Sequence, residues 1–129
     1  MTRSRSTLAN VALYIALAFV IYGGWAFYVN WPAGPLQASM SGVAQGIYSG
    51  VNTYIYARII EFAFDRIAHP LMRWLVPALL PNLLFLSILS TVHWAVGTPA
   101  ILMTILPSAV IGTAYTALYT RQLHRGESA

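Results

Sequence analysis

The positions of the basic residues constrain this chain more than any other feature. All seven are arginines, and they fall in three groups, at the start, the middle and the end of the sequence: Arg3, Arg5, Arg58, Arg66, Arg73, Arg121 and Arg125. The stretches between these groups are long enough to cross a membrane. Only 8% of the residues are charged, whereas a typical soluble domain has about 25%. Lipid is therefore the expected surrounding of this chain.

The arginines also predict an orientation, because cytoplasmic loops of membrane proteins are enriched in arginine and lysine. If segment 36–57 crosses the membrane, all seven arginines lie on the cytoplasmic side. If it lies in the interface instead, Arg58, Arg66 and Arg73 fall outside. We therefore predict one all-α membrane domain over residues 1–129, a four-transmembrane-helix bundle of the bacterial inner membrane with both termini in the cytoplasm. Four spans of about 20 residues leave no room for a soluble catalytic domain.

The predicted helices end at turn residues and prolines. The four spans are residues 8–28, 36–57, 74–94 and 99–120. The second helix is expected to continue in the cytoplasm as far as His69. Pro70 ends it there, because the residue before a proline avoids the helical conformation. Thr98 suits the N-cap of the last helix, and Pro99 suits its first position.

A stripe of small residues lies on the second predicted helix. Gly42, Gly46 and Gly50 recur every four residues, and Ala38 extends the row. That spacing places them on one face of the helix. Small residues allow another helix to approach closely, which favours association where lipid supplies no hydrophobic force. The partner helix can belong to the same chain or to another one, and the pattern alone leaves both interpretations open.

A polar row lies beside this glycine stripe on the same helix: Gln37, Ser41, Gln45 and Asn52. Polar side chains are costly in hydrocarbon unless they are hydrogen-bonded. The row therefore predicts either hydrogen bonds to neighbouring helices or a polar permeation path.

The last predicted helix has a second small and hydroxylated stripe at four-residue spacing, with Thr120 at its end: Thr104, Ser108, Gly112 and Thr116. This stripe is a candidate surface for the second helix. Pro107 lies near the middle of the same helix. It leaves the carbonyl of Met103 without its usual donor and predicts a kink.

Candidate catalytic residues are few. Ion-coupled transporters usually keep an ionisable group near the bilayer centre, and none is predicted there. His93 lies near the outer boundary, with Ser90 one turn before it, but a Ser–His pair without an acidic partner is weak evidence for a nucleophile. A solvated or hydrogen-bonded histidine is the favoured interpretation, and we predict no catalytic residue and no enzymatic activity.

Metal, cofactor and nucleic-acid binding are also not expected. Glu61, Asp65 and His69 recur every four residues and could offer two carboxylates and an imidazole to a metal. A solvated helix face is the simpler interpretation, since one such row is not a complete ligand set. The chain has no cysteine, and its arginines do not form the single basic face of a nucleic-acid binder.

Two short segments resemble a group of short bacterial inner-membrane proteins. Residues 93–107, HWAVGTPAILMTILP, are similar to a His-x3-Gly-Thr-Pro turn that leads into the last span of those proteins. Gln45 and Gly46 match a Thr-Gln-Gly helix of the same group, with Ala44 in place of the threonine. The resemblance covers about a third of the chain. It implies the four-span architecture and no particular activity.

Two functions follow from these patterns. The first is a non-enzymatic accessory or assembly subunit, or a homo-oligomer, that associates through the glycine stripe within a larger membrane complex. The alternative is a small transporter or channel that uses the polar row, as a dimer. In both, membrane lipid is the expected surrounding partner.

Overall fold

Four long helices make up the chain. The structure, a computed structural model, describes the backbone of residues 2–127 and the side chains of residues 10–126. Its elements are α1 (Thr2–Asn30), the short 3-10 helix η1 (Trp31–Ala33), α2 (Pro35–Arg66), α3 (Pro70–Ala95) and α4 (Ile101–Glu127). The predicted all-helical architecture is confirmed, and the described residues include no strand.

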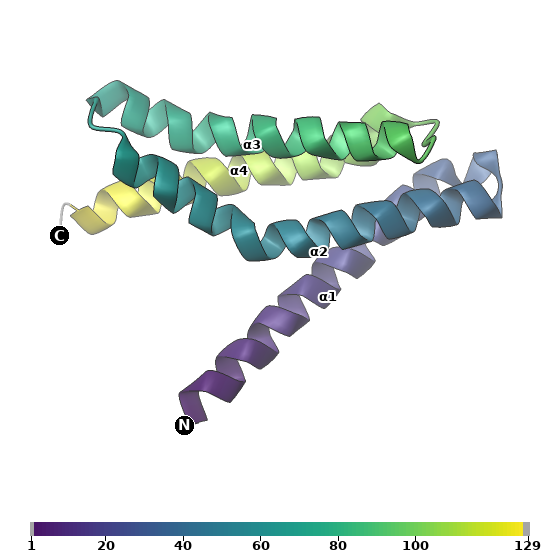
Figure 1. Ribbon diagram of the computed structural model, residues 1–129, viewed down its shortest axis with the longest axis horizontal. Helices are drawn as coiled ribbons and strands as arrows, with labels where there is room; N and C mark the ends of the chain where they lie inside the picture. Colours follow the sequence, from purple (N-terminus) through teal and green to yellow (C-terminus); the bar gives the residue numbers. More distant parts are fainter. Residues whose placement is uncertain (1, 128–129) are drawn as a thin grey trace.

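Successive helices run in opposite directions (Figure 1). Both termini and the α2–α3 connection lie toward one end of the long axis, and the other two connections lie at the opposite end. Helices α2, α3 and α4 lie side by side. The C-terminal half of α1 contacts α2 and α4, and its N-terminal half diverges from them (Figure 1).

Many polar side chains lie in the interior of the bundle, and large apolar side chains cover much of its surface. Gln45 and His93 are completely buried, whereas Leu36 and Leu102 are 76% and 80% exposed. In a water-soluble protein, polar side chains such as these are mostly exposed and large apolar ones are mostly buried. Three helical segments are long and apolar enough to cross a membrane: Asn10–Ala33, Pro70–Ala95 and Ile101–Gly126. Both observations support a membrane protein with at least three candidate spans.

The backbones of α1 and α2 approach each other at glycines. A Cβ atom added to Gly23 would lie 2.8 Å from the carbonyl oxygen of Gly42, and one added to Gly42 would lie 3.0 Å from that of Gly23. A Cβ at Gly46 would lie 2.8 Å from the ring of Phe19, and Gly50 also lies against α1. The glycine stripe of α2 therefore packs against α1 of the same chain.

The helix predicted to reach residue 69 ends three residues earlier. Ile67 is extended, with φ −104° and ψ 115°, and α2 ends at Arg66. His69 is instead the N-cap of α3, where its ring accepts a hydrogen bond from the Met72 N–H at 3.5 Å. Pro70 follows as the first helical residue. The backbone before a proline is extended, so the break falls before His69 and not after it.

The start of the last helix also differs from the prediction, since α4 begins at Ile101 and not at residue 99. Gly97, with φ +71°, ends α3 in a left-handed turn, and the Thr98 N–H donates to the His93 carbonyl at 2.9 Å. This is the usual closing pattern of a helix with a glycine after its C-cap. The predicted N-cap role of Thr98 is wrong. Instead, the Oδ1 of Asn30 on α1 accepts a hydrogen bond from the Ala100 N–H at 3.2 Å.

A side chain of α1 supplies the donor that Pro107 lacks. Proline has no N–H, so the carbonyl four residues before it, at Met103, has no donor within the helix. The indole Nε1 of Trp25 donates to this carbonyl at 2.9 Å, and α4 continues through Pro107. A second bond joins the same two helices, from the Asn30 Nδ2 to the Thr104 hydroxyl at 2.8 Å.

The glycine contact gives the first prediction. Gly23→Ala places a methyl group against the backbone of α2, which cannot move aside as a side chain can. We expect a loss of about 1–3 kcal/mol in unfolding free energy, measured by denaturation in detergent micelles. Gly24→Ala is the matched control, because a Cβ there meets nothing within 4 Å. It should be neutral or stabilise by up to about 1 kcal/mol, and equal losses in the two variants would contradict the close approach at Gly23.

Candidate functional site

A buried glutamine joins three helices at the centre of the polar interior. The Oε1 of Gln45 on α2 lies 2.5 Å from the Nε2 of His93 on α3. The amide Nε2 of Gln45 donates to the hydroxyl of Ser108 on α4 at 3.0 Å and to that of Ser49 at 3.3 Å. Since an amide oxygen only accepts hydrogen bonds, this arrangement places the proton of the neutral imidazole on His93 Nε2.

The other ring nitrogen of His93 extends the network toward the α3–α4 turn. His93 Nδ1 lies 2.8 Å from the hydroxyl of Thr98, which lies 2.9 Å from the hydroxyl of Ser41. With the proton on Nε2, Thr98 donates to Nδ1 and Ser41 donates to Thr98. One continuous hydrogen-bonded chain therefore runs from Ser41, through Thr98, His93 and Gln45, to the serines of α2 and α4.

The polar row of α2 faces α3 and α4. Gln37 donates to the Val96 carbonyl at 3.0 Å, and Ser41 and Gln45 belong to the network around His93. Asn52 differs from the other three members. Its Oδ1 is buried and has no hydrogen-bond partner among the described residues. The first part of the row thus makes inter-helix hydrogen bonds, and its last member does not.

The small stripe of α4 also faces the interior, but its members meet different helices. Thr104 accepts a hydrogen bond from Asn30 on α1, and Ser108 accepts one from Gln45 on α2. A Cβ at Gly112 would lie 2.6 Å from the Oδ1 of Asn82 on α3. Thr116 is fully buried, as are Thr120 and, on α2, Ala38. The stripe is therefore shared among three neighbours and is not a surface for α2 alone.

A cavity of about 240 Å³ lies where the polar row reaches Asn52. All four long helices contribute to its wall. The residues that determine its chemistry are Tyr22 from α1, Tyr48, Asn52 and Tyr56 from α2, Asn82 from α3, and Tyr115 from α4. Ser49 and Ser108 also line it, so the hydrogen-bonded chain from Ser41 ends at the cavity wall.

The aromatic side chains of this wall are held in place by one another and by hydrogen bonds. The ring of Tyr56 stacks on that of Tyr115 with centroids 5.6 Å apart and meets the edge of Phe85 at 4.8 Å. The Tyr56 hydroxyl donates to Asn82 Oδ1 at 3.0 Å, and the Tyr48 hydroxyl donates to the Phe85 carbonyl at 2.6 Å. These contacts use the hydroxyl protons of Tyr48 and Tyr56 within the wall.

Ser90 and His93 do not form a catalytic pair. The Ser90 hydroxyl donates to the Leu86 carbonyl of its own helix at 2.8 Å. His93 is completely buried, and its ring nitrogens lie against Gln45 and Thr98.

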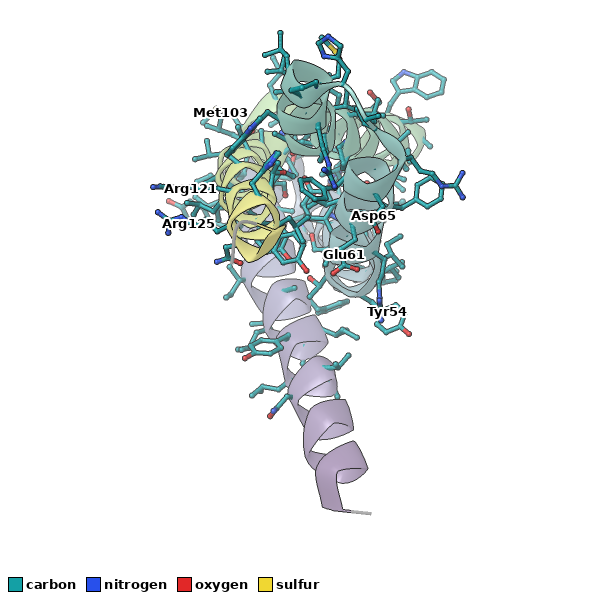
Figure 2. All side chains as sticks on the ribbon, turned by 90° about the vertical axis from the view of Figure 1, so that its left-hand side faces the viewer. Tyr54, Glu61, Asp65, Met103, Arg121 and Arg125 are labelled. Atoms are coloured by element: carbon teal, nitrogen blue, oxygen red, sulfur yellow. The ribbon has the colours of Figure 1, made fainter. Side chains whose placement is uncertain are left out.

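Glu61, Asp65 and His69 do not come together as a metal site either. Glu61 accepts a hydrogen bond from the Tyr119 hydroxyl at 2.6 Å and lies 3.5 Å from Arg58. Asp65 is exposed and His69 caps α3. No three His, Asp or Glu side chains within the described part of the chain are close enough to hold a metal ion. Figure 2 shows Glu61 and Asp65 on α2 and the side chains of Arg121 and Arg125 directed outward from α4.

Several residues of the site have only a weak sequence signal. Asn82 is the single amide in segment 74–94, and an isolated amide in an apolar stretch predicts a buried hydrogen-bonding position. Asn82 accepts from Tyr56 and donates to the Thr113 hydroxyl at 2.7 Å, so it connects α2 with α4. The tyrosines of the cavity come from three helices and share no spacing.

No known protein family, curated protein or solved structure matches this chain.

The Gln45–His93 contact gives the second prediction. Either Gln45→Leu or His93→Leu leaves a buried polar partner unsatisfied and should lower the unfolding free energy by about 1–3 kcal/mol. The double variant removes both partners and should lose clearly less than the sum of the single losses. Ser90→Ala is the control and should change the free energy by less than about 0.5 kcal/mol. Additive losses in a detergent denaturation series would show that the two side chains are not coupled.

Proposed function

We propose that this chain is a small protein of the bacterial inner membrane that binds a small amphipathic molecule in the cavity among its four helices. In this proposal α2 is a fourth span, both termini are cytoplasmic, and the cavity is the binding site of a small transporter. The single observation that supports it most is the cavity of about 240 Å³, whose wall is made of side chains from all four long helices.

The fourth span is supported by the outward face of α2. Its side chains there are apolar, and Met40, Val43, Ile47 and Val51 are all 44–58% exposed. The polar side chains of the same helix point inward to α3 and α4. A helix with this distribution can lie in lipid, although its mean hydropathy is lowered by the inward face.

The orientation is supported by where the arginines lie. The α2–α3 connection, next to Arg66 and Arg73, and the C-terminal end of α4, with Arg121 and Arg125, lie toward the same end of the bundle (Figure 1). The backbone of α1 begins toward that end as well; the side chains of Arg3 and Arg5 lie outside the described ones. Positive residues at one end predict the cytoplasmic side.

The polar row ends at the cavity with one unpaired atom, the Oδ1 of Asn52. A buried polar atom without a partner costs about 1–3 kcal/mol, and such atoms are rare in folded proteins. Every other member of the polar row has a partner within the protein. The row therefore changes character at the cavity, where the Oδ1 of its last residue has no partner among the described residues.

In this proposal the ligand enters from the side of α1. Tyr22 lines the cavity, and α1 diverges from α2 and α4 on the N-terminal side of this region (Figure 1). Leu13 and Tyr14, in the diverging half, are 55% and 61% exposed. An amphipathic molecule dissolved in the membrane would enter between α1 and its neighbours.

Association through the glycine stripe has weaker support, because α1 of the same chain covers Gly42, Gly46 and Gly50. A partner helix could reach this surface only after α1 had left it. The role of accessory subunit or homo-oligomer stays a second proposal, which predicts that native mass spectrometry of the protein released gently from its membrane finds it in a larger assembly.

Asn52→Leu tests the binding proposal. This substitution removes the unpartnered oxygen and disturbs no hydrogen bond described above. We expect it to raise the unfolding free energy of the ligand-free protein by about 1 kcal/mol. We also expect it to abolish the small-molecule adduct that native mass spectrometry detects on protein released gently from its own membrane.

Thr53→Val is the control for this test. Thr53 lines the same cavity, but its hydroxyl donates to the Ser49 carbonyl of its own helix at 2.8 Å. The adduct should persist in this variant. A wild-type protein with no adduct, or an adduct unaffected by Asn52→Leu, would contradict the proposed function.

A further inference from the structure

We infer that the molecule bound in this cavity is uncharged, with an apolar body about the size of one ring and an oxygen atom that forms hydrogen bonds, as in an alcohol or a ketone. This inference rests on the proposed function, since it names the chemical class of the ligand of the same site. It is drawn from the charges, the hydroxyl groups and the rings of the cavity wall.

The wall of the cavity carries no charge. In the part of the chain described by the structure, no Asp, Glu, Arg or His side chain lines it. The ionisable residues of the wall are tyrosines, whose phenol groups are neutral at physiological pH. An ion that leaves water for such a site loses its hydration and meets no opposite charge, which is strongly unfavourable. A charged ligand should therefore bind far more weakly than an uncharged one of the same shape.

Two ionisable side chains are connected to the wall, and both are already paired within the protein. His93 bonds to Gln45, which in turn bonds to the serines of the wall. Glu61 accepts the Tyr119 hydroxyl at 2.6 Å and lies 3.5 Å from Arg58. Since neither His93 nor Glu61 lines the cavity, neither supplies an opposite charge to a ligand.

Hydroxyl groups of the wall favour an oxygen atom on the ligand. Ser49 and Ser108 each accept a hydrogen bond from Gln45. The hydroxyls of Tyr22 and Tyr115 bond to no other described residue. Tyr115 is 40% exposed and Tyr22 is half-buried, so a ligand can reach both side chains. A hydroxyl both donates and accepts, and we therefore assign the ligand oxygen to Tyr22 and Tyr115.

The rest of the wall suits an apolar body. The ring of Tyr56 stacks on that of Tyr115 with centroids 5.6 Å apart and meets the edge of Phe85 at 4.8 Å. Leu86 and Leu89 add aliphatic surface. Such surfaces make favourable contacts with a ring. Pockets for drug-sized ligands usually enclose roughly 300–1,000 Å³, and this cavity encloses about 240 Å³, so the body is limited to about one ring with a short chain.

Four probes of similar size separate these properties. 2-Phenylethanol is uncharged and has the oxygen, phenethylamine is a cation, 3-phenylpropionate is an anion, and ethylbenzene has no polar group. The experiment is isothermal titration calorimetry of the full chain in detergent micelles, after size-exclusion chromatography and circular dichroism have shown that each variant is folded. At neutral pH we expect 2-phenylethanol to bind at least about tenfold more tightly than phenethylamine and 3-phenylpropionate.

A change of pH tests the charge of the bound form directly. If only neutral forms bind, the affinity for phenethylamine rises about tenfold per pH unit as the pH is raised from about 7 to about 8.5. The affinity for 3-phenylpropionate rises by the same factor as the pH is lowered from about 7 to about 5.5. 2-Phenylethanol does not titrate and is the control, with one affinity over the whole range. Affinities for the two ions that do not vary with pH would overturn the inference.

The double variant Tyr22→Phe, Tyr115→Phe tests the contact with the ligand oxygen, because it removes two hydroxyls and keeps both rings. It should weaken 2-phenylethanol binding about two- to tenfold and leave ethylbenzene binding unchanged. Tyr54→Phe is the matched control, since Tyr54 is 67% exposed and points away from the bundle (Figure 2). An equal loss in this control, or no loss in the double variant, would contradict the assignment of the oxygen.

Failure of this inference and failure of the proposed function give different results. If the ions bind in their charged forms, the site exists, the uncharged class is wrong and the proposed function stands. The same holds if no probe binds while native mass spectrometry shows the small-molecule adduct. If no probe binds and the native protein has no adduct, both proposals fail.

Discussion

The arrangement of the helices in this bundle depends on the hydrogen bonds of Gln45. A primary amide buried among apolar helices must find partners for both its oxygen and its nitrogen. The partners of Gln45 are His93 on α3 and Ser108 on α4. These two contacts fix the rotation of α2 about its axis. The same requirement explains two contacts of α1. Asn30 and Trp25 both supply donors to α4, one to Thr104 and one to the carbonyl left open by Pro107.

Two faces of α2 have separate neighbours, and this helix therefore positions the other three. Its glycine face lets α1 approach to backbone contact at Gly23. Its polar face bonds to α3, to α4 and to the turn between them. Its third face is apolar and exposed. The cavity lies where the polar face continues beyond Gln45, and Tyr22 of α1 and Asn52 of α2 both line it.

Periodicity in the sequence predicts the helices and the faces of α2, because four-residue spacing has one geometrical meaning in a helix. It does not identify the neighbour of each face, since a glycine stripe suits a helix of the same chain as well as one of another. Local rules fail where a tertiary contact competes with them. Thr98 suits an N-cap, but its hydroxyl bonds to His93 and Ser41. Because α2 ends at Arg66, Asp65 and His69 do not belong to one helix, and their four-residue spacing does not place them on one face. The tyrosines that line the cavity share no spacing that the sequence could reveal.

The two inward faces of α2 also differ in when their partners are made. The glycine face meets α1, which precedes it in the chain. The polar face meets residues that the ribosome adds much later, since His93 and Ser108 follow Gln45 by 48 and 63 positions. During synthesis, α1 and α2 can join as a hairpin while Gln45 still has no partner from a later helix. Assembly of this bundle therefore includes a late step. In this step α3 and α4 pack onto α2 and supply the hydrogen-bond partners that α1 does not provide for its amide side chains.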